Sequence, residues 1–201
     1  MQVITDQVLA FSKDNAPCAT AQPGEVLLFK TQDCFAGRIP TEDVTMKDLN
    51  FSYGFTNPAA GPVYIEGAEP GDVLVVDIYD VQVADHGVIA TDDHCGPLYQ
   101  TTDYRSKIIP IEDGMADFNG VKFPIDPMIG VIGTAPDGED VIDGFVGAHG
   151  GNLDNKLITK GTRMSSPCAC RARCCKWATC TPPWAMPSCA ARASRSRPRS
   201  R

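Results

Sequence analysis

The chain has 201 residues, of which 43% are hydrophobic, and carries a formal net charge of −7 at pH 7. This length suffices for one domain with a sizeable core or for two small domains. No run of eighteen apolar residues could form a transmembrane helix, and the N-terminus lacks the basic start and apolar centre of a signal peptide, so we expect a soluble cytoplasmic protein and exclude a membrane partner.

Charge is distributed unevenly along the chain. All 25 acidic residues lie at or before Asp154, and up to Lys160 they are accompanied by only 9 basic residues, which gives this part a net charge of −16. The other 9 basic residues lie from Arg163 onward. An acidic surface disfavours nucleic acid and anionic membranes as partners. We therefore expect a small neutral or cationic substrate.

The first 160 residues predict a mainly β structure, of the β-sandwich or jelly-roll type, with long loops and few short helices. Short runs rich in Val, Ile and Phe alternate with Gly and Pro, a pattern typical of all-β sandwiches and barrels. The predicted strands are 25–29, 63–66, 73–83 and 107–111. Both faces of 73–83 are mostly apolar, which indicates an inner strand of a sheet.

The same dipeptide, Pro-Gly, precedes two of the predicted strands. Pro23-Gly24 and Pro70-Gly71 each place Pro at the second and Gly at the third position of a turn. This arrangement predicts type II turns, whose third position needs a positive φ.

The segment between these strands predicts one short helix and one long loop. Residues 41–50 could form the helix, with Thr41 as its N-cap and acidic residues in its first turn. Residues 87–104 are polar and broken, so we expect a loop there, and long loops in compact domains are often functional.

Asp33 follows a predicted strand and precedes Cys34, so a loop could present its carboxylate. A solvated turn aspartate is the alternative. Cys34 could be a nucleophile only if a base such as His149 came near and favoured the thiolate; a buried, inert cysteine is the other interpretation.

His86 and His94 flank the long loop, with acidic residues beside each of them. Zinc accepts imidazole and carboxylate ligands, although such pairs in a polar loop are usually solvated. The chain contains no Gly-x-Ser-x-Gly elbow, no P-loop and no dinucleotide fingerprint.

Residues 147–156 read Gly-Ala-His-Gly-Gly-Asn-Leu-Asp-Asn-Lys, and no other stretch groups an imidazole, a carboxylate and two amides so closely. Gly150 and Gly151 allow a positive φ, so His149 and Asp154 could turn toward one point and hold a metal ion or an activated water. The alternative is a tight turn in which Asn152 and Asp154 cap their own backbone.

Four segments, 24–37, 57–72, 130–136 and 147–156, resemble the acetamidase/formamidase family in order and spacing over nearly all of residues 1–164. One departure is Ala60, where the family usually has Thr before Gly-Pro. The resemblance implies hydrolysis of short-chain amides such as formamide and acetamide to carboxylate and ammonia, on a β-rich, jelly-roll-like fold. It leaves open a homo-oligomeric state of the intact homologue.

The resemblance also implies a divalent metal, with zinc as the expected ion. A bound metal can polarise an amide carbonyl and lower the pKa of its water toward about 7, and a nearby carboxylate can move the proton to the leaving amine. We expect His149 and Asp154 to be the metal ligands. The expected catalytic residues are His149, Asp154 and Asp33, and the expected substrate-binding residues are Asn57, Glu66 and Asn152.

From Ser165 to Arg201 the chain has no Val, Ile, Leu or Phe and no acidic residue, and six of the nine cysteines lie there. Such a segment cannot bury enough apolar surface to offset its ordering entropy. We therefore divide the chain into a β domain at 1–164, incomplete at its C-terminal end, and a disordered basic tail at 165–201. The cysteine spacings do not give the paired units of a zinc knuckle.

One hypothesis explains the composition of this tail: it is translated out of frame after Met164. If each codon gives its first two bases to the last two positions of a shifted codon, every Cys reads Leu, Val or Met. The shifted reading then resembles the family's next segment, with Gly-Asp-x-His-Ala followed by Gly-Asp and an acidic residue. Thr179 stands where an Asp would be and Thr181 where a His would be, so we expect the chain as printed to have little activity. The alternative is a non-catalytic β-sandwich binding module with a basic tail. A third hypothesis is that the basic tail binds nucleic acid, which predicts salt-dependent retention on DNA that is lost when the residues after Met164 are deleted.

Overall fold

The computed structural model describes residues 1–49, 53–93, 96–169, 176–180 and 188–196. Within these ranges the chain forms strands and a single 3₁₀ turn, η1 (Tyr53–Phe55), which confirms the prediction of a mainly β fold. No helix among the described residues is long and apolar enough to cross a membrane.

Five strands form the first sheet, in which β1 and β5 are parallel and the other neighbours are antiparallel. In sheet order they are β1 (Gln2–Ile4), β5 (Val26–Lys30), β18 (Ser188–Ser196), β7 (Val73–Gln82) and β16 (Arg163–Pro167).

The second sheet carries the segment that holds His149. In sheet order its strands are β14 (Val146–Gly147), β15 (Gly150–Asn152), β12 (Val131–Thr134), β17 (Lys176–Cys180), β6 (Ala59–Ile65) and β2 (Gln7–Val8). A short strand, β4 (Ala19–Ala21), pairs with β6 in parallel. Beside this sheet, β3 (Ala10–Phe11) pairs with β13 (Val141–Ile142).

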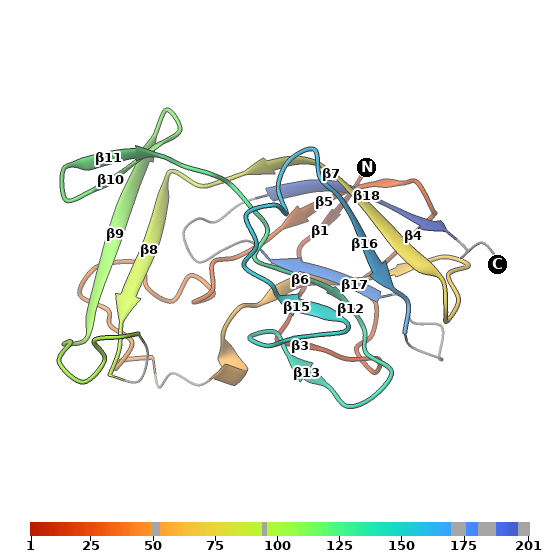
Figure 1. The fold of residues 1–201 in the computed structure, drawn as a ribbon, viewed down its shortest axis with the longest axis horizontal. Coiled ribbons are helices and arrows are strands. Elements are labelled where there is room, and N and C mark those ends of the chain that lie inside the picture. Colours follow the sequence, from red (N-terminus) through yellow and green to blue (C-terminus); the bar gives the residue numbers. More distant parts are fainter. Residues whose placement is uncertain (50–52, 94–95, 170–175, 181–187, 197–201) are drawn as a thin grey trace.

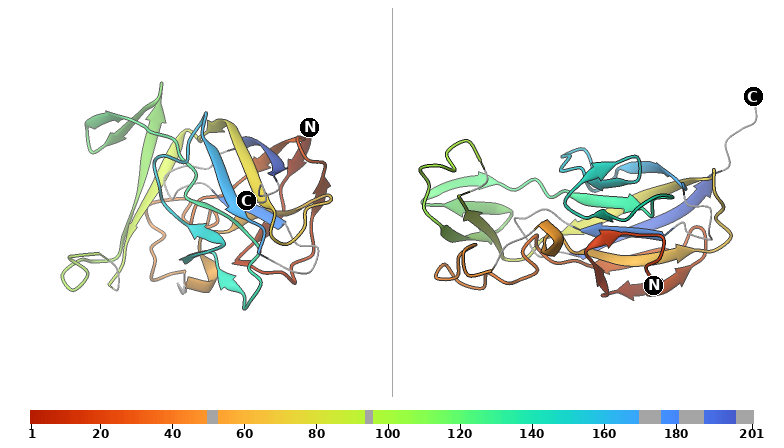
Figure 2. Two further views of the ribbon diagram at one scale, coloured as in Figure 1. Left: turned by 45° about the vertical axis from the view of Figure 1, so that its right-hand side comes forward. Right: turned by 90° about the horizontal axis from the view of Figure 1, so that it is seen from below.

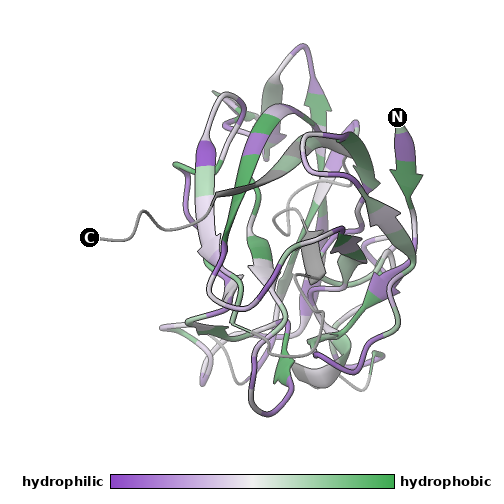
Figure 3. Cartoon of the chain, turned by 90° about the vertical axis from the view of Figure 1, so that its right-hand side faces the viewer, coloured by the Kyte–Doolittle hydropathy of each residue, from purple (hydrophilic) through white to green (hydrophobic). Residues whose placement is uncertain are grey.

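These two sheets pack face to face, and the view from below in Figure 2 shows them as layers. Leu27 and Phe29 from β5 and Leu74 from β7 meet Val63 and Ile65 from β6, all without solvent exposure. Fully buried and less buried residues alternate along β5 and most of β7, as expected for strands with one face in the core, and Figure 3 shows hydrophobic segments within the strands of the sandwich. Burial of these side chains is the main source of stability for the sandwich.

A separate antiparallel sheet stands beside the sandwich (Figure 1). Its strands are β8 (His86–Thr91), β9 (Arg105–Glu112), β10 (Met115–Phe118) and β11 (Val121–Pro124). One of its faces packs on the loop after β5, because Val88 and Ile108 contact a cluster that contains Phe35 and Ile39.

The predicted strands correspond to β5, β6, β7 and β9, and both predicted turns are confirmed. Gly24 and Gly71 have φ values of 92° and 90°, and each turn closes with a hydrogen bond of 3.0 Å between residues three apart. Only a residue without a Cβ adopts this conformation without strain, so the Pro-Gly pairs place the starts of β5 and β7.

The predicted helix at 41–50 is wrong over its described residues. Residues 41–49 form consecutive turns, with hydrogen bonds from Val44 N–H to the Thr41 carbonyl and from Asp48 N–H to the Thr45 carbonyl. The Asp48 carboxylate accepts from the backbone N–H of Thr45 and from its hydroxyl, at 2.8 and 2.7 Å. This local side-chain bond competes with the helical ladder. The predicted loop at 87–104 is also partly wrong, because β8 extends to Thr91.

The predicted disorder of residues 165–201 differs from the structure where the tail is described. β16, β17 and β18 carry parts of it, and β18 lies between β5 and β7. Strand pairing uses backbone groups that every residue except Pro supplies. Ala191 and Ala193 are small enough to be fully buried there, so a sequence without large aliphatic residues still fills this place, and the described tail strands pair with the β domain.

Candidate active site

His149 lies in the connection of the β14–β15 hairpin, at the edge of the second sheet. Its carbonyl accepts the backbone N–H of Thr134 at 2.8 Å, which fixes the hairpin against β12. Its imidazole packs on Phe11, with ring centroids 5.0 Å apart and planes inclined by 60°. The backbone of His149 is therefore fixed to β12, and its ring packs on Phe11 of β3.

Glycines around His149 make room for the imidazole. A Cβ on Gly147 would lie 2.9 Å from Nδ1, and one on Gly151 would lie 3.0 Å from Nε2 and collide with the carbonyl oxygen of Phe145. Gly150 and Gly151 have φ values of 102° and 96°, as expected from the sequence. The glycines are thus needed both for backbone conformation and for close approach.

The imidazole of His149 is only 4% exposed, and its Nε2 has no hydrogen-bond partner among the described residues. Burial lowers the pKa of His149 below its ordinary value, because the charged form loses its hydration. A neutral imidazole with an unoccupied ring nitrogen can accept a proton or ligate a metal.

Asp154 lies beyond the other end of β15, in a left-handed conformation with φ of 43°. The backbone N–H groups of Leu153 and Asp154 both donate to the carbonyl of Gly130, at 2.8 and 3.0 Å. With its amide nitrogen facing Asp154, Asn152 donates to both carboxylate oxygens at 3.2 and 3.3 Å. Partial desolvation raises the pKa of the Asp154 carboxyl, which makes its carboxylate a stronger base.

His149 and Asp154 do not meet in direct contact. Their backbones are bonded to Thr134 and Gly130, four residues apart along an extended segment, a span of about 13 Å. The Nε2 atom lies close to Gly151, and no hydrogen bond or ion pair joins the two side chains in the described part of the chain. That the two side chains turn toward one shared metal ion or water stays a prediction.

Cys34 follows Asp33 in the loop after β5 and is held as a neutral thiol. Burial raises the pKa of the Cys34 thiol well above its usual range, and the negative charges of Asp33 and Asp154 raise it further. A neutral thiol is a poor nucleophile, so the structure favours the interpretation of Cys34 as an inert cysteine.

The Asp33 carboxylate is 4% exposed and fixes its own loop. Its Oδ1 accepts the backbone N–H groups of Phe35 at 2.8 Å and Gly37 at 3.0 Å. The carbonyl of Cys34 accepts the backbone N–H of Asn57 at 2.9 Å, so Asn57 joins this group at the start of β6. Asn57 has φ of 56°, a conformation that asparagine tolerates better than most residues.

Two other residues predicted for chemistry lie elsewhere. Glu66 follows β6, whose length of roughly 20 Å separates it from Asn57, and its exposed carboxylate accepts from Gln22. His86 bonds the neighbouring Asp85 through Nδ1 at 2.6 Å near the surface, and His94 lies outside the described residues.

Asp143 is a buried carboxyl group that sequence reasoning missed. It has no solvent exposure, its Oδ2 accepts the Ala59 N–H at 3.2 Å, and its Oδ1 has no partner in the described structure. Burial raises the pKa of Asp143 to about 8. The available signal was an acidic residue between the apolar pairs Val141-Ile142 and Phe145-Val146.

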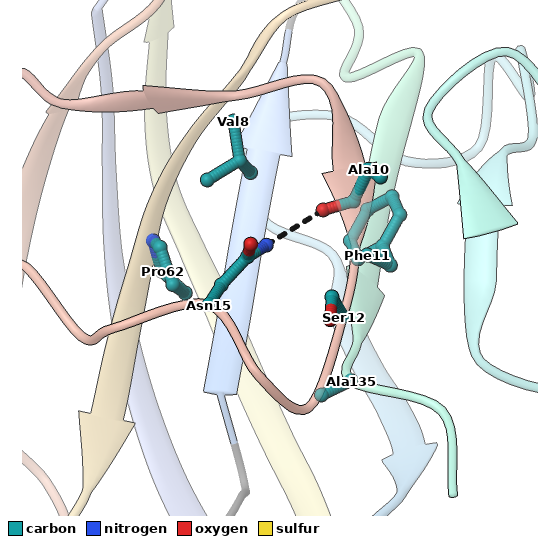
Figure 4. A pocket seen from close by; sticks show the side chains of 7 residues that line it. All are labelled: Val8, Ala10, Phe11, Ser12, Asn15, Pro62 and Ala135. Carbon is teal, nitrogen blue, oxygen red and sulfur yellow. Dashed lines mark hydrogen bonds between the residues drawn. The ribbon is translucent and has the colours of Figure 1, made fainter. Parts of the chain in front are cut away.

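A small hollow lies beside Phe11 and is lined by Val8, Ala10, Phe11, Ser12, Asn15, Pro62 and Ala135 (Figure 4). Asn15 closes it by donating to the Ala10 carbonyl at 2.8 Å. Its volume of about 10 Å³ accommodates at most one water molecule. This hollow is therefore too small for a substrate.

The described residues alone do not fit a metal centre. The free Nε2 of His149 suits one metal ligand, but no group of three or more His, Cys, Asp and Glu side chains comes together in the ranges described. Structural and catalytic zinc sites use at least three protein ligands. The zinc site stays a prediction, and any further ligands would have to come from outside the described residues.

Comparisons with known proteins agree on one family. Residues 10–145 match the model of the acetamidase/formamidase family. The crystal structure of an acetamidase from Bacillus halodurans superposes with a TM-score of 0.89 at 31% identity, covering 98% of this chain and 71% of that one. The formamidase of Methylophilus methylotrophus is 31% identical over 109 residues, which are 51% of this chain and 25% of that protein. The acetamidase of Mycolicibacterium smegmatis is 32% identical over 68 residues, which are 34% of this chain and 17% of that protein. The matched segments thus span a quarter or less of these two curated relatives.

Proposed function

This chain belongs to the acetamidase/formamidase family, and we propose that its site serves the hydrolysis of short-chain amides such as formamide and acetamide to carboxylate and ammonia. The observation that carries the proposal is the buried His149 imidazole, whose Nε2 has no partner among the described residues, on the hairpin that leads directly to Asp154. The relatives named acetamidase and formamidase support the substrate class.

Hydrolysis of an unactivated amide needs a water made nucleophilic and a proton delivered to the leaving amine. Asp154 is the described group best suited to both tasks. Its carboxylate is at the surface, its pKa is raised, and the Asn152 amide beside it can orient it. It would accept the proton of the attacking water and then give that proton to the amine.

The other residues have supporting parts in this proposal. The Oδ1 atom of Asp33 accepts two backbone N–H groups of its own loop, so Asp33 positions that loop. The neutral His149 imidazole is a second proton acceptor on the same hairpin as Asp154. Asn57, whose backbone N–H donates to the Cys34 carbonyl ahead of β6, is assigned to substrate binding in this proposal.

We further propose that the segment after Met164 is read out of frame and that its intact form completes the site. β17 ends at Cys180, which pairs with Val131, and Val131 pairs on its other side with Asn152. In the shifted reading an Asp replaces Thr179, a His replaces Thr181 and further acidic residues follow. These replacements lie at or just after the end of β17, one strand away from β15, which leads to Asp154. These are the ligand types that a zinc site would still need.

Ammonia release tests the proposal directly. The printed chain and a frame-restored chain, differing only in the segment after Met164, are assayed with formamide and acetamide. We expect turnover by the restored chain and little by the printed one. In the restored chain, Asp154→Asn should abolish turnover, whereas Asp140→Asn should not, because Asp140 is exposed and lies apart from the site residues in the sequence.

Zinc binding tests the metal separately from activity. Isothermal titration should show one tight site in the restored chain and none of comparable affinity in the printed chain. Equal binding by both chains would place the metal away from the segment after Met164 and contradict this part of the proposal.

A further inference from the structure

A second cavity, of about 550 Å³, lies between the four-stranded sheet and the segment that follows it. One wall is the sheet β8–β11, and the other comprises residues 124–127 and Lys156. Cavities of this size are typical of small-molecule sites. Nothing in the proposed amide hydrolysis uses this space.

The sheet wall of the cavity is apolar. In the β8–β9 register Gly87 pairs with Ile109, and both line the cavity, whereas Val88 and Ile108 in the next pair face the Phe35 cluster on the other side of the sheet. The large side chains on the cavity face are Ile89, Ile109, Ile111, Phe118 and Phe123. Phe118 and Phe123 keep 36% and 44% of their surface exposed, so this face has no complete cover among the described residues.

Two opposite charges stand on the other wall. Asp126 and Lys156 both line the cavity, and their segments are tied together by a hydrogen bond of 2.8 Å from Ile129 N–H to the Ile158 carbonyl and by one of 2.5 Å from the Thr159 hydroxyl to the Pro127 carbonyl. Neither charged side chain has an ion-pair or hydrogen-bond partner in the part of the chain that the structure describes. One cationic and one anionic group are therefore available to a ligand.

We propose that this cavity binds a small zwitterion with an apolar body, of the class of an unblocked hydrophobic dipeptide. The ligand's ammonium group faces Asp126, its carboxylate faces Lys156, and its side chains cover the Ile and Phe residues of the sheet. A simple fatty acid carries only an anion, so it would leave Asp126 without an opposite charge and bring a like charge into the same cavity. A zwitterion satisfies both charges, and its apolar side chains remove the exposed Phe surface from water.

Binding of leucyl-phenylalanine to the full 201-residue chain tests this proposal, by titration calorimetry or by chemical-shift changes. We expect a dissociation constant of about 1 mM or tighter. Lys156→Gln and Asp126→Asn should each weaken binding roughly tenfold, because each removes one charge-assisted hydrogen bond. The matched controls are Lys122→Gln and Glu112→Gln, which remove exposed charges outside the cavity lining and should leave binding unchanged.

A third variant tests the apolar wall. Ala116→Leu adds bulk at a buried position of the lining and should reduce binding, with folding checked by the thermal midpoint. The charge variants are exposed, so they keep the test valid if this variant unfolds. The proposal is overturned if no binding is detected, if N-acetyl-leucyl-phenylalanine amide binds as tightly as the unblocked peptide, or if the Lys156 and Asp126 variants bind like the wild type.

Discussion

Asp143, which follows β13, accepts a hydrogen bond from the backbone N–H of Ala59 at the start of β6, across 3.2 Å. This bond joins two segments that are 84 residues apart, and it is the only partner that the described structure gives the buried carboxyl. Ionisation of this carboxyl should therefore destabilise the folded state, so the pH dependence of stability tests its burial.

Replacing Asp143 with Asn should change the pH dependence of stability. Burial raises the pKa of Asp143 from 3.8 to about 8, so between these values the folded state holds a proton that the unfolded state releases. The wild type should then lose unfolding free energy as pH rises from about 4 to about 8, by at most about 1.4 kcal/mol per pH unit. Urea unfolding at several pH values measures this, and the difference between wild type and Asp143→Asn should shrink or reverse as pH rises. Parallel curves for the two proteins would contradict the buried, protonated carboxyl.

His149 should lower the free energy of unfolding as pH falls, whereas Asp143 lowers it as pH rises. Burial lowers its pKa below 6.5, so the unfolded state takes up a proton first as pH falls. Its contribution to stability is therefore present above about pH 6.5 and is lost as pH falls through the folded pKa. In a His149→Phe variant the unfolding free energy should fall less between pH 7 and pH 5. The imidazole resonance, assigned by its absence from this variant, should titrate below the ordinary value; a midpoint at or above 6.5 would argue against burial of the ring.

Gly151→Ala should destabilise the fold much more than Gly161→Ala. Both glycines have positive φ, 96° and 86°, so both substitutions carry a conformational cost of roughly 1–2 kcal/mol. Only at position 151 would the new Cβ collide with the Phe145 carbonyl oxygen and approach His149 Nε2, since Gly161 faces open space. Thermal and urea unfolding of the two variants measure the difference, and equal losses would mean that the hairpin is looser than described.

Asp33→Ala should cost roughly 1–3 kcal/mol of stability, because two backbone N–H groups lose their acceptor. Asp33→Asn keeps an acceptor oxygen and should recover most of that loss. If Asp33 only positions its loop, the Asn variant of the frame-restored chain should also retain turnover. A stable Asn variant without turnover would give the Asp33 charge a direct part in the reaction.

The sequence predicted the elements whose signal is local. The Pro-Gly turns at Gly24 and Gly71 and the strands that follow them depend on neighbouring residues alone, and they agree with the structure. The helix at 41–50 failed because the Asp48 side chain bonds Thr45, a competition that a charge pattern does not reveal. The strands in the tail were missed because β18 is held by the backbones of β5 and β7 and by the small size of Ala191 and Ala193.

Features of the site could be predicted from the sequence only where all the residues involved lie in one short segment. The glycines around His149 could be inferred from residues 147–156 alone. The burial of Asp33 depends on how the loop after β5 packs, and the separation of Glu66 from Asn57 depends on β6 being one continuous strand. Asp143 was missed because its burial by Ala59 is a tertiary contact.

The decisive measurement is ammonia release from formamide and acetamide by the printed chain and by the frame-restored chain, assayed side by side. We expect turnover by the restored chain, its loss on Asp154→Asn, and little turnover by the printed chain. An inactive restored chain that is folded and zinc-loaded would contradict amide hydrolysis, and a printed chain as active as the restored one would contradict the shifted frame.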